Sequence, residues 1–301
     1  MSTARLKMSP LLRRVFHWGG STLALIGVVF VFFRLHSYWV GLDISRIKFS
    51  EWGLIALLAL IYGSANLFLS LAWWHLLRHL GASVTWLGAF RIYGVSQLAK
   101  YLPGNIFHLA GRQALGMAVG LSASILAKST IWELGAFAIA GSLFTWLIVP
   151  LILPTFPEGG SVLLLIGSVG LITGLLRSVI GRQPMWSFVC QLFFLVISGM
   201  VFVALLGLIV DGDGKVFRHC LMIGGAYILA WLVGLVTPGA PAGVGIREMI
   251  LLLLLKGLVN EADLLMAVLL GRLVTVIGDL ICFAAASSIP NKFCTLEKSN
   301  V

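Results

Sequence analysis

The sequence predicts an all-α, polytopic membrane protein with about eight transmembrane segments, which form one domain over residues 1–301. Composition is the first observation behind this prediction. Of the 301 residues, 59% are apolar and only 11% are charged, whereas a soluble domain is about 45–50% apolar and about a quarter charged. The second observation is a mean hydropathy of +1.03. The third is a series of apolar runs whose lengths are close to the roughly 20 residues that a helix needs to cross a bilayer. Together they exclude a soluble enzyme, a disordered protein and a disulfide scaffold.

Eight apolar segments account for the predicted crossings. They are residues 15–33, 52–77, 125–149, 161–176, 186–210, 221–236, 249–259 and 264–289. The segment 249–259 is too short alone, so it either joins the Gly-rich residues before it or is a half-helix. Residues 150–160 contain no Lys or Arg and are expected outside, whereas 177–182 contain two arginines and are expected inside. This alternation predicts that both chain ends lie in the cytoplasm.

The charge balance is strongly basic, with 21 Lys and Arg against 11 Asp and Glu. In a soluble protein this excess would suggest a nucleic-acid partner. Here the basic residues lie mostly in short loops between apolar runs, as the positive-inside rule requires. We therefore predict the bilayer as a partner and no nucleic acid. The four cysteines are far apart and form no C-x-x-C pair, so neither a metal site nor a cofactor is predicted.

Two apolar segments, 96–112 and 235–248, are interrupted by Pro-Gly in a matching way. An arginine follows each proline after nine residues: Arg112 follows Pro103, and Arg247 follows Pro238. Proline ends a helix, and broken backbone at membrane depth is tolerated only where protein or a water-filled cavity covers it. Paired interruptions of this kind indicate a transporter-like binding site between two repeats, inverted or parallel. The alternative is a pair of ordinary loops whose arginines reach the lipid headgroups.

The same two segments resemble the signatures of the lysylphosphatidylglycerol synthase transmembrane-region family. The first runs from Gln97 (Gln-Leu-Ala-Lys-Tyr-Leu-Pro-Gly-Asn) to Gly-Arg at 111–112, and the second ends in Gly-Val-Gly-Ile-Arg-Glu at 243–248. The resemblance spans about residues 52–289, although Ala-Pro-Ala at 240–242 interrupts the usual glycine run. It implies a stand-alone, flippase-like domain in a bacterial or archaeal cytoplasmic membrane that handles a lipid or lipid-linked sugar. It does not imply aminoacyl transfer, which belongs to a separate soluble domain that we expect to be absent.

The predicted substrate-binding residues come from these segments and from ionisable side chains inside apolar runs, which usually face the interior of a bundle. They are Lys100, Tyr101, Pro103, Gly104, Asn105, Arg112, Glu133, Pro238, Gly239, Gly243, Gly245, Arg247, Glu248, Arg272 and Asp279. Our first hypothesis is that Arg112 and Arg247 grip an anionic headgroup, because a guanidinium matches phosphate geometry. Glu133 and Asp279 are the candidate proton carriers. A purely structural polar network is the alternative.

The leading prediction of function is therefore a protein that binds and translocates an anionic phospholipid or a lipid-linked glycan. No catalytic motif or nucleotide loop is present, which favours a protein that is not an enzyme. One alternative is an intramembrane enzyme acting on lipid-linked sugars or phosphates, for which His108, Glu133 and Glu248 are the nearby candidate groups. Another is a membrane partner of a separate glycosyltransferase in cell-envelope glycan synthesis.

Overall fold

The computed structural model describes residues 47–102, 106–210, 215–237, 243 and 245–290, and five single residues between 33 and 43. Over this part of the chain all regular secondary structure is helical. Five helical segments are long and apolar enough to cross a membrane, and Cys220–Val236 is a shorter apolar helix. The long ones are Phe49–His79, Ala123–Ile152, Glu158–Ile180, Arg182–Ile209 and Glu261–Ser287. The first predicted crossing, 15–33, lies outside the described residues except for its last position.

The helices follow the apolar runs of the sequence closely, with two additions around the first interruption. In chain order they are η2 (Phe49–Glu51), α2 (Trp52–His79), α3 (Trp86–Gln97), η3 (Leu98–Tyr101), α4 (Phe107–Ala118), α5 (Ala123–Leu143), η4 (Phe144–Ile148), α6 (Val149–Ile152), α7 (Glu158–Leu175), η5 (Leu176–Ile180), α8 (Arg182–Ile209), α9 (Lys215–Arg218), α10 (Cys220–Val236), α11 (Ile246–Leu254) and α12 (Glu261–Ser287).

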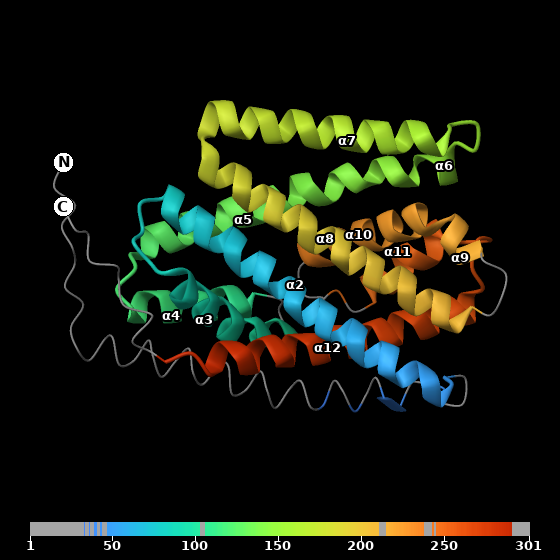
Figure 1. Ribbon diagram of the computed structural model, residues 1–301, viewed down its shortest axis with the longest axis horizontal. Helices are drawn as coiled ribbons and strands as arrows, with labels where there is room; N and C mark the ends of the chain where they lie inside the picture. The colour runs from blue at the N-terminus through green and yellow to red at the C-terminus, as the bar shows by residue number, and fades with distance from the viewer. Residues whose placement is uncertain are drawn as a thin grey trace.

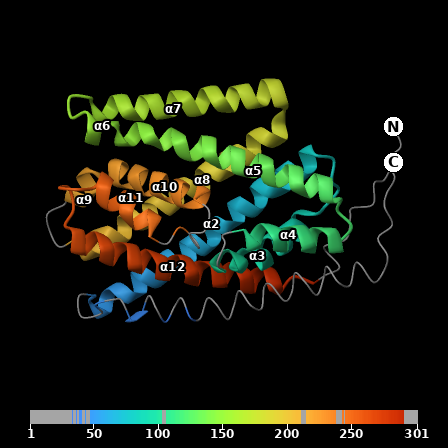
Figure 2. The same ribbon diagram turned by 180° about the vertical axis from the view of Figure 1, so that it is seen from behind.

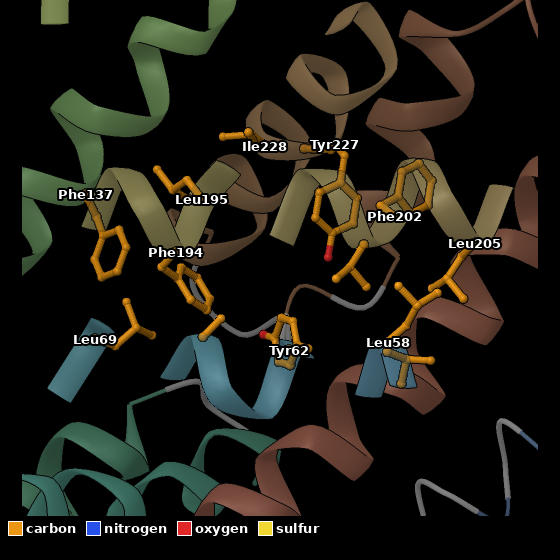
Figure 3. Close-up of a cluster of buried hydrophobic side chains, with 14 of the residues drawn as sticks. Leu58, Tyr62, Leu69, Phe137, Phe194, Leu195, Phe202, Leu205, Tyr227 and Ile228 are labelled. Carbon is orange, nitrogen blue, oxygen red and sulfur yellow. The ribbon is translucent and has the colours of Figure 1, made fainter. Parts of the chain in front are cut away.

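The long helices α2, α8 and α12 form the centre of the bundle (Figure 1). Helices α2 and α12 approach so closely that a Cβ added at Gly278 would lie 2.8 Å from the carbonyl oxygen of Ala59 and 2.8 Å from the amide nitrogen of Gly63. Small residues allow this approach, which is the usual way in which membrane helices pack. The core between α2, α8 and α10 is filled by aliphatic and aromatic side chains, among them the stacked rings of Phe202 and Tyr227 (Figure 3).

Helices α5 and α7 form an outer layer over one side of this centre (Figures 1 and 2). Only Ser161 of α7 is buried, and large apolar side chains such as Leu163, Ile166 and Leu171 are exposed. Gly170 and Gly174 of α7 have nothing within 4 Å of an added Cβ. The residues of α7 therefore present an apolar surface of the kind that a lipid-facing helix has.

The first interrupted segment forms a helical hairpin, α3–η3–α4, that enters the bundle from one end. Helix α3 starts where α12 ends, because Phe90 packs against Ala286, and it runs inward until Tyr101 packs against Val276 near the middle of α12. Helix α4 then runs back, and Gly116 contacts Leu126 near the start of α5. The hairpin therefore reaches only part of the way through the bundle, as Figure 2 shows.

The second interrupted segment forms the hairpin α10–α11, which enters from the opposite end. Near the start of α10, Gly225 lies against Leu147 of η4, and further along, Leu232 lies against Gly141 of α5. Helix α11 then returns toward the start of α12 (Figure 2). Because α5 runs from the first end to the second, these contacts fix the opposite entry of the two hairpins.

The two halves of the described chain therefore share one order of helices with reversed direction. Helices α2, α3, α4 and α5 correspond to α8, α10, α11 and α12, and each member of a pair runs opposite to its counterpart along the bundle (Figures 1 and 2). The sequence left the choice between an inverted and a parallel repeat open, and this arrangement is inverted. It brings the inner ends of the two hairpins to the same level of the bundle.

Candidate functional site

A cavity of about 90 Å³ lies where the two hairpins meet. Residues from α2, α3, α4, α5, α8, α10, α11 and α12 line it. Six of the predicted site residues are among them: Lys100, Tyr101, Arg112, Glu133, Arg247 and Arg272. Glu248, Asp279 and Gly243 are bonded to these lining residues. Pro103, Gly104, Asn105, Pro238 and Gly239 lie outside the described residues.

Arg112 on α4 forms a buried ion pair with Glu133 on α5. The pair is reinforced on both sides. The hydroxyl of Tyr93 donates a hydrogen bond to Glu133 Oε1 at 3.1 Å, and the guanidinium carbon of Arg112 lies 4.0 Å from the centre of the Tyr93 ring. The ring of Trp73 lies near the same guanidinium, at 5.4 Å. An arginine held in this way is already neutralised by the protein.

Asp279 on α12 is the centre of a second buried network. Its Oδ2 lies 2.7 Å from Lys100 Nζ and also accepts a hydrogen bond from the hydroxyl of Tyr101. Its Oδ1 accepts a hydrogen bond of 3.1 Å from Asn66 Nδ2. Asp279 has no exposed surface, whereas the side chain of Lys100 is 18% exposed. The network therefore ties η3 to α2 and α12, and its lysine reaches the cavity.

A third ion pair joins α11 to α12. Glu248 stands in the first turn of α11, where the helix dipole favours an anion. Its Oε1 lies 2.6 Å from NH2 of Arg272, and its Oε2 accepts the backbone amide of Gly245 at 2.8 Å. Arg272 also donates to the carbonyl of Gly243 at 3.2 Å. Gly243 has a φ of +71° and packs against Gly234, which explains why glycine is needed at this point.

Arg247 differs from the other three cations at the cavity. It is only 9% exposed, yet no acidic side chain within the described residues forms an ion pair with it. Its guanidinium carbon lies 5.6 Å from the centre of the Tyr227 ring, and its Nε is buried without a hydrogen-bond partner. An uncompensated buried charge costs several kcal/mol. An arginine in this state, on the wall of a cavity, is suited to accept an anion.

Aromatic side chains form part of the cavity lining. The rings of Phe137, Phe194 and Trp231 pack on one another, with centroids 5.3–6.4 Å apart, and Figure 3 shows Phe137 and Phe194 facing α2. Leu134 on α5 also lines the cavity, although it is 39% exposed on the outside of the bundle. The lining of the cavity therefore combines charged side chains with apolar and aromatic ones.

Several residues of the site were missed by the sequence interpretation. Tyr62, Tyr93 and Gln97 line the cavity, and Asn66 binds Asp279. They lie inside apolar helices, where a tyrosine or an amide gives no signal of its own. Only the recurrence of a tyrosine about 20 residues before each arginine could have indicated Tyr93 as a partner of Arg112.

His108 also lines the cavity, buried, and its Nδ1 has no hydrogen-bond partner. No cluster of three His, Cys, Asp or Glu side chains suited to a metal ion occurs in the part of the chain that the structure describes. His108 and Gln97 thus add an imidazole and an amide to the charged and hydroxyl side chains that line the cavity.

A scan of this sequence against models of protein families finds no match, and a search of curated proteins finds none either.

Proposed function

We propose that this chain is an integral membrane protein that binds an anionic phospholipid or lipid-linked glycan in the cavity between the two hairpins and moves it across the membrane. One observation carries the proposal: Arg247, buried on the cavity wall, lacks an acidic partner within the described residues. Ionisable groups at membrane depth mark substrate paths, and an arginine fork matches the oxygens of a phosphate.

The inverted arrangement of the hairpins supports movement as well as binding. In the proposed placement, α3–α4 and α10–α11 are re-entrant from opposite faces of the membrane, so their inner ends meet near its midplane. Substrate sites of many transporters lie at the interface of inverted repeats at this depth. Rocking of one half against the other would then open the same cavity to either face.

The ends of the bundle support the orientation in which the α2–α3 connection faces the cytoplasm. Arg78, Arg91, Arg177 and Arg182 lie at that end, and none of the acidic residues that the structure describes lies there. The other end carries both signs of charge, for example Glu158 and Arg218. The positive-inside rule assigns the basic end to the cytoplasm, which agrees with two cytoplasmic termini. In this placement the predicted segments 221–236 and 249–259 form one re-entrant hairpin instead of two of the eight crossings.

The lining of the cavity supports an amphipathic ligand. Arg247 would hold a phosphate, while the apolar side chains of the lining, among them the partly exposed Leu134, would contact acyl chains. Exposing acyl chains to water would cost about 0.8 kcal/mol for each CH₂ group, so a lipid carrier needs apolar surface beside its headgroup site. This inference also agrees with the family that the two motifs resemble.

The test is translocation of a fluorescent phosphatidylglycerol in proteoliposomes, followed by quenching with membrane-impermeant dithionite. Without translocation, dithionite quenches only the label in the outer leaflet, which is about one half of the total. Wild-type protein should raise the quenched fraction above this value. Arg247→Gln should lose most of this gain, whereas Arg177→Gln, an exposed arginine outside the cavity, should keep it. Quenching that stays at one half with wild-type protein, over a range of anionic lipids and lipid-linked glycans, would contradict the proposal.

A further inference from the structure

The two hairpins present their arginines in the same way. In the first, Arg112 on α4 contacts the ring of Tyr93 on α3. In the second, Arg247 on α11 contacts the ring of Tyr227 on α10. Each arginine therefore stands on the returning helix of its hairpin and lies over a tyrosine of the entering helix. The inverted repeat extends from the helices to these side chains.

The hairpins differ in the residue that faces the arginine from the next helix. Glu133 is the eleventh residue of α5 and pairs with Arg112. The twelfth residue of α12, at nearly the same place in the second half, is Arg272, which pairs with Glu248 instead. A cation thus replaces the acid. The first half contains its own carboxylate for the arginine, and the second half does not.

The charges of the site consequently leave an excess of one positive charge. The cations are Lys100, Arg112, Arg247 and Arg272, and the acids are Glu133, Glu248 and Asp279. Each acid is paired with one cation, and Arg247 remains. The residues between the described parts of the hairpins, 103–105, 238–242 and 244, include no ionisable side chain in the sequence. One negative charge from outside would complete the site.

We propose that Arg247 binds one singly charged phosphodiester, in the way that Arg112 binds the carboxylate of Glu133. This inference rests on the proposed function and adds the charge class of its substrate. A phosphomonoester or a pyrophosphate brings a second negative charge, which has no partner at the described site and costs desolvation at membrane depth. The Arg112–Glu133 pair is then an internal example of the complex that Arg247 forms with its ligand.

The proposal is tested by titrating the full chain, in phosphatidylcholine nanodiscs, with short-chain phosphatidylglycerol and short-chain phosphatidic acid at pH 8. Phosphatidylglycerol carries one charge, whereas a phosphomonoester, with a second pKa of about 6, carries nearly two. Calorimetry should show one phosphatidylglycerol bound per chain and weaker binding of phosphatidic acid. Dimethyl phosphate, a diester without acyl chains, should bind more weakly than the lipid; equal binding would identify a soluble phosphodiester rather than a lipid as the source.

Two variants should shift this binding in opposite directions. Arg247→Gln removes charge-assisted hydrogen bonds and should weaken phosphatidylglycerol binding about 10- to 100-fold. Glu133→Gln removes the internal carboxylate from Arg112 and should increase binding, either as a second phosphatidylglycerol per chain or as tighter binding of phosphatidic acid. Because Glu133→Gln predicts a gain, misfolding cannot imitate it. Arg177→Gln serves as the control for loss of a surface charge.

The contradicting results separate this inference from the proposed function. If phosphatidylglycerol binds and is translocated, but Arg247→Gln binds it as wild type does, the assignment of Arg247 is wrong. A wild-type preference for phosphatidic acid, or a Glu133→Gln variant without any gain, overturns the single-charge inference in the same way. If no anionic probe binds to wild type, the proposed function is wrong together with it.

Discussion

The contact between α2 and α12 gives a prediction whose size follows from the structure. A Cβ at position 278 would lie 2.8 Å from Ala59 O and from Gly63 N, whereas ordinary van der Waals contact begins near 3.4 Å. The Gly278→Ala change therefore requires the two helices to separate by about 0.6 Å. The hydrogen bond from Asn66 to Asp279, 3.1 Å long and one residue away, would lengthen toward about 3.7 Å and be lost.

Overpacking of this kind costs about 1–3 kcal/mol, and loss of the buried hydrogen bond places the expected cost near the upper value. The assay is unfolding of the purified protein in mixed detergent micelles, followed by tryptophan fluorescence. Gly170→Ala is the matched control, because position 170 lies in helix α7 with nothing within 4 Å of an added Cβ. Both changes share the gain of about 0.5–1 kcal/mol from replacing a helical glycine, so the difference between the variants isolates the clash.

The expected result is a free energy of unfolding for Gly278→Ala that lies about 2–3 kcal/mol below that of Gly170→Ala. Equal free energies of unfolding for the two variants, to within about 0.5 kcal/mol, would refute the close approach of α2 and α12. The reasoning about the cavity would then also need revision, since Asn66 and Asp279 meet at this crossing.

The remaining predictions concern the buried network and the end of the bundle. Asp279→Asn leaves the Lys100 ammonium without its carboxylate, and the free energy of unfolding should fall by about 2–3 kcal/mol. This loss is smaller than for a wholly buried ion pair, because the side chain of Lys100 is partly exposed. An unchanged free energy of unfolding would contradict the ion pair. Arg91 donates hydrogen bonds to the carbonyls of Ser287 and Ile289, which the end of α12 leaves unpaired. Arg91→Ala should therefore speed amide hydrogen exchange in the last turn of α12 and leave exchange in its first turn unchanged. Equal exchange of the last turn in wild type and Arg91→Ala would show that Arg91 does not stabilise this end of the helix.

The membrane-helical class of the fold follows from the sequence because long apolar runs have few structural alternatives. Helices α2, α7, α8, α10 and α12 begin and end within a few residues of the predicted segments, and α5 reaches the end of its segment through η4 and α6. The sequence predicted an interruption within residues 96–112, but not that these residues form the end of α3, the turn η3 and the start of α4. Helices α3 and α4, of 12 residues each, are shorter than a crossing, and Trp86–Gln97 carries too little hydropathy to stand out as a membrane segment. Eight crossings remain a prediction.

The candidate site was predicted in part for a related reason. Charged residues inside apolar runs are conspicuous, so Arg112, Glu133 and Arg272 could be named from the sequence, and the structure brings all three to one cavity. Their pairing could not be derived, because Arg112 and Glu133 stand on different helices whose packing no local pattern encodes. The hypothesis that both arginines face a headgroup treated Arg112 and Arg247 as equal, and the acid on α5 makes them unequal.

The proposed function requires an anionic lipid headgroup in the cavity beside Arg247. Photo-crosslinking of phosphatidylglycerol that carries a headgroup diazirine, with the modified residues located by mass spectrometry, tests this occupancy. Crosslinks on cavity residues such as Leu109, Leu235 and Arg247 are predicted, and they should disappear when unlabelled phosphatidylglycerol is in excess. Crosslinks confined to exposed side chains such as Leu163 on α7, with none in the cavity, would contradict the account.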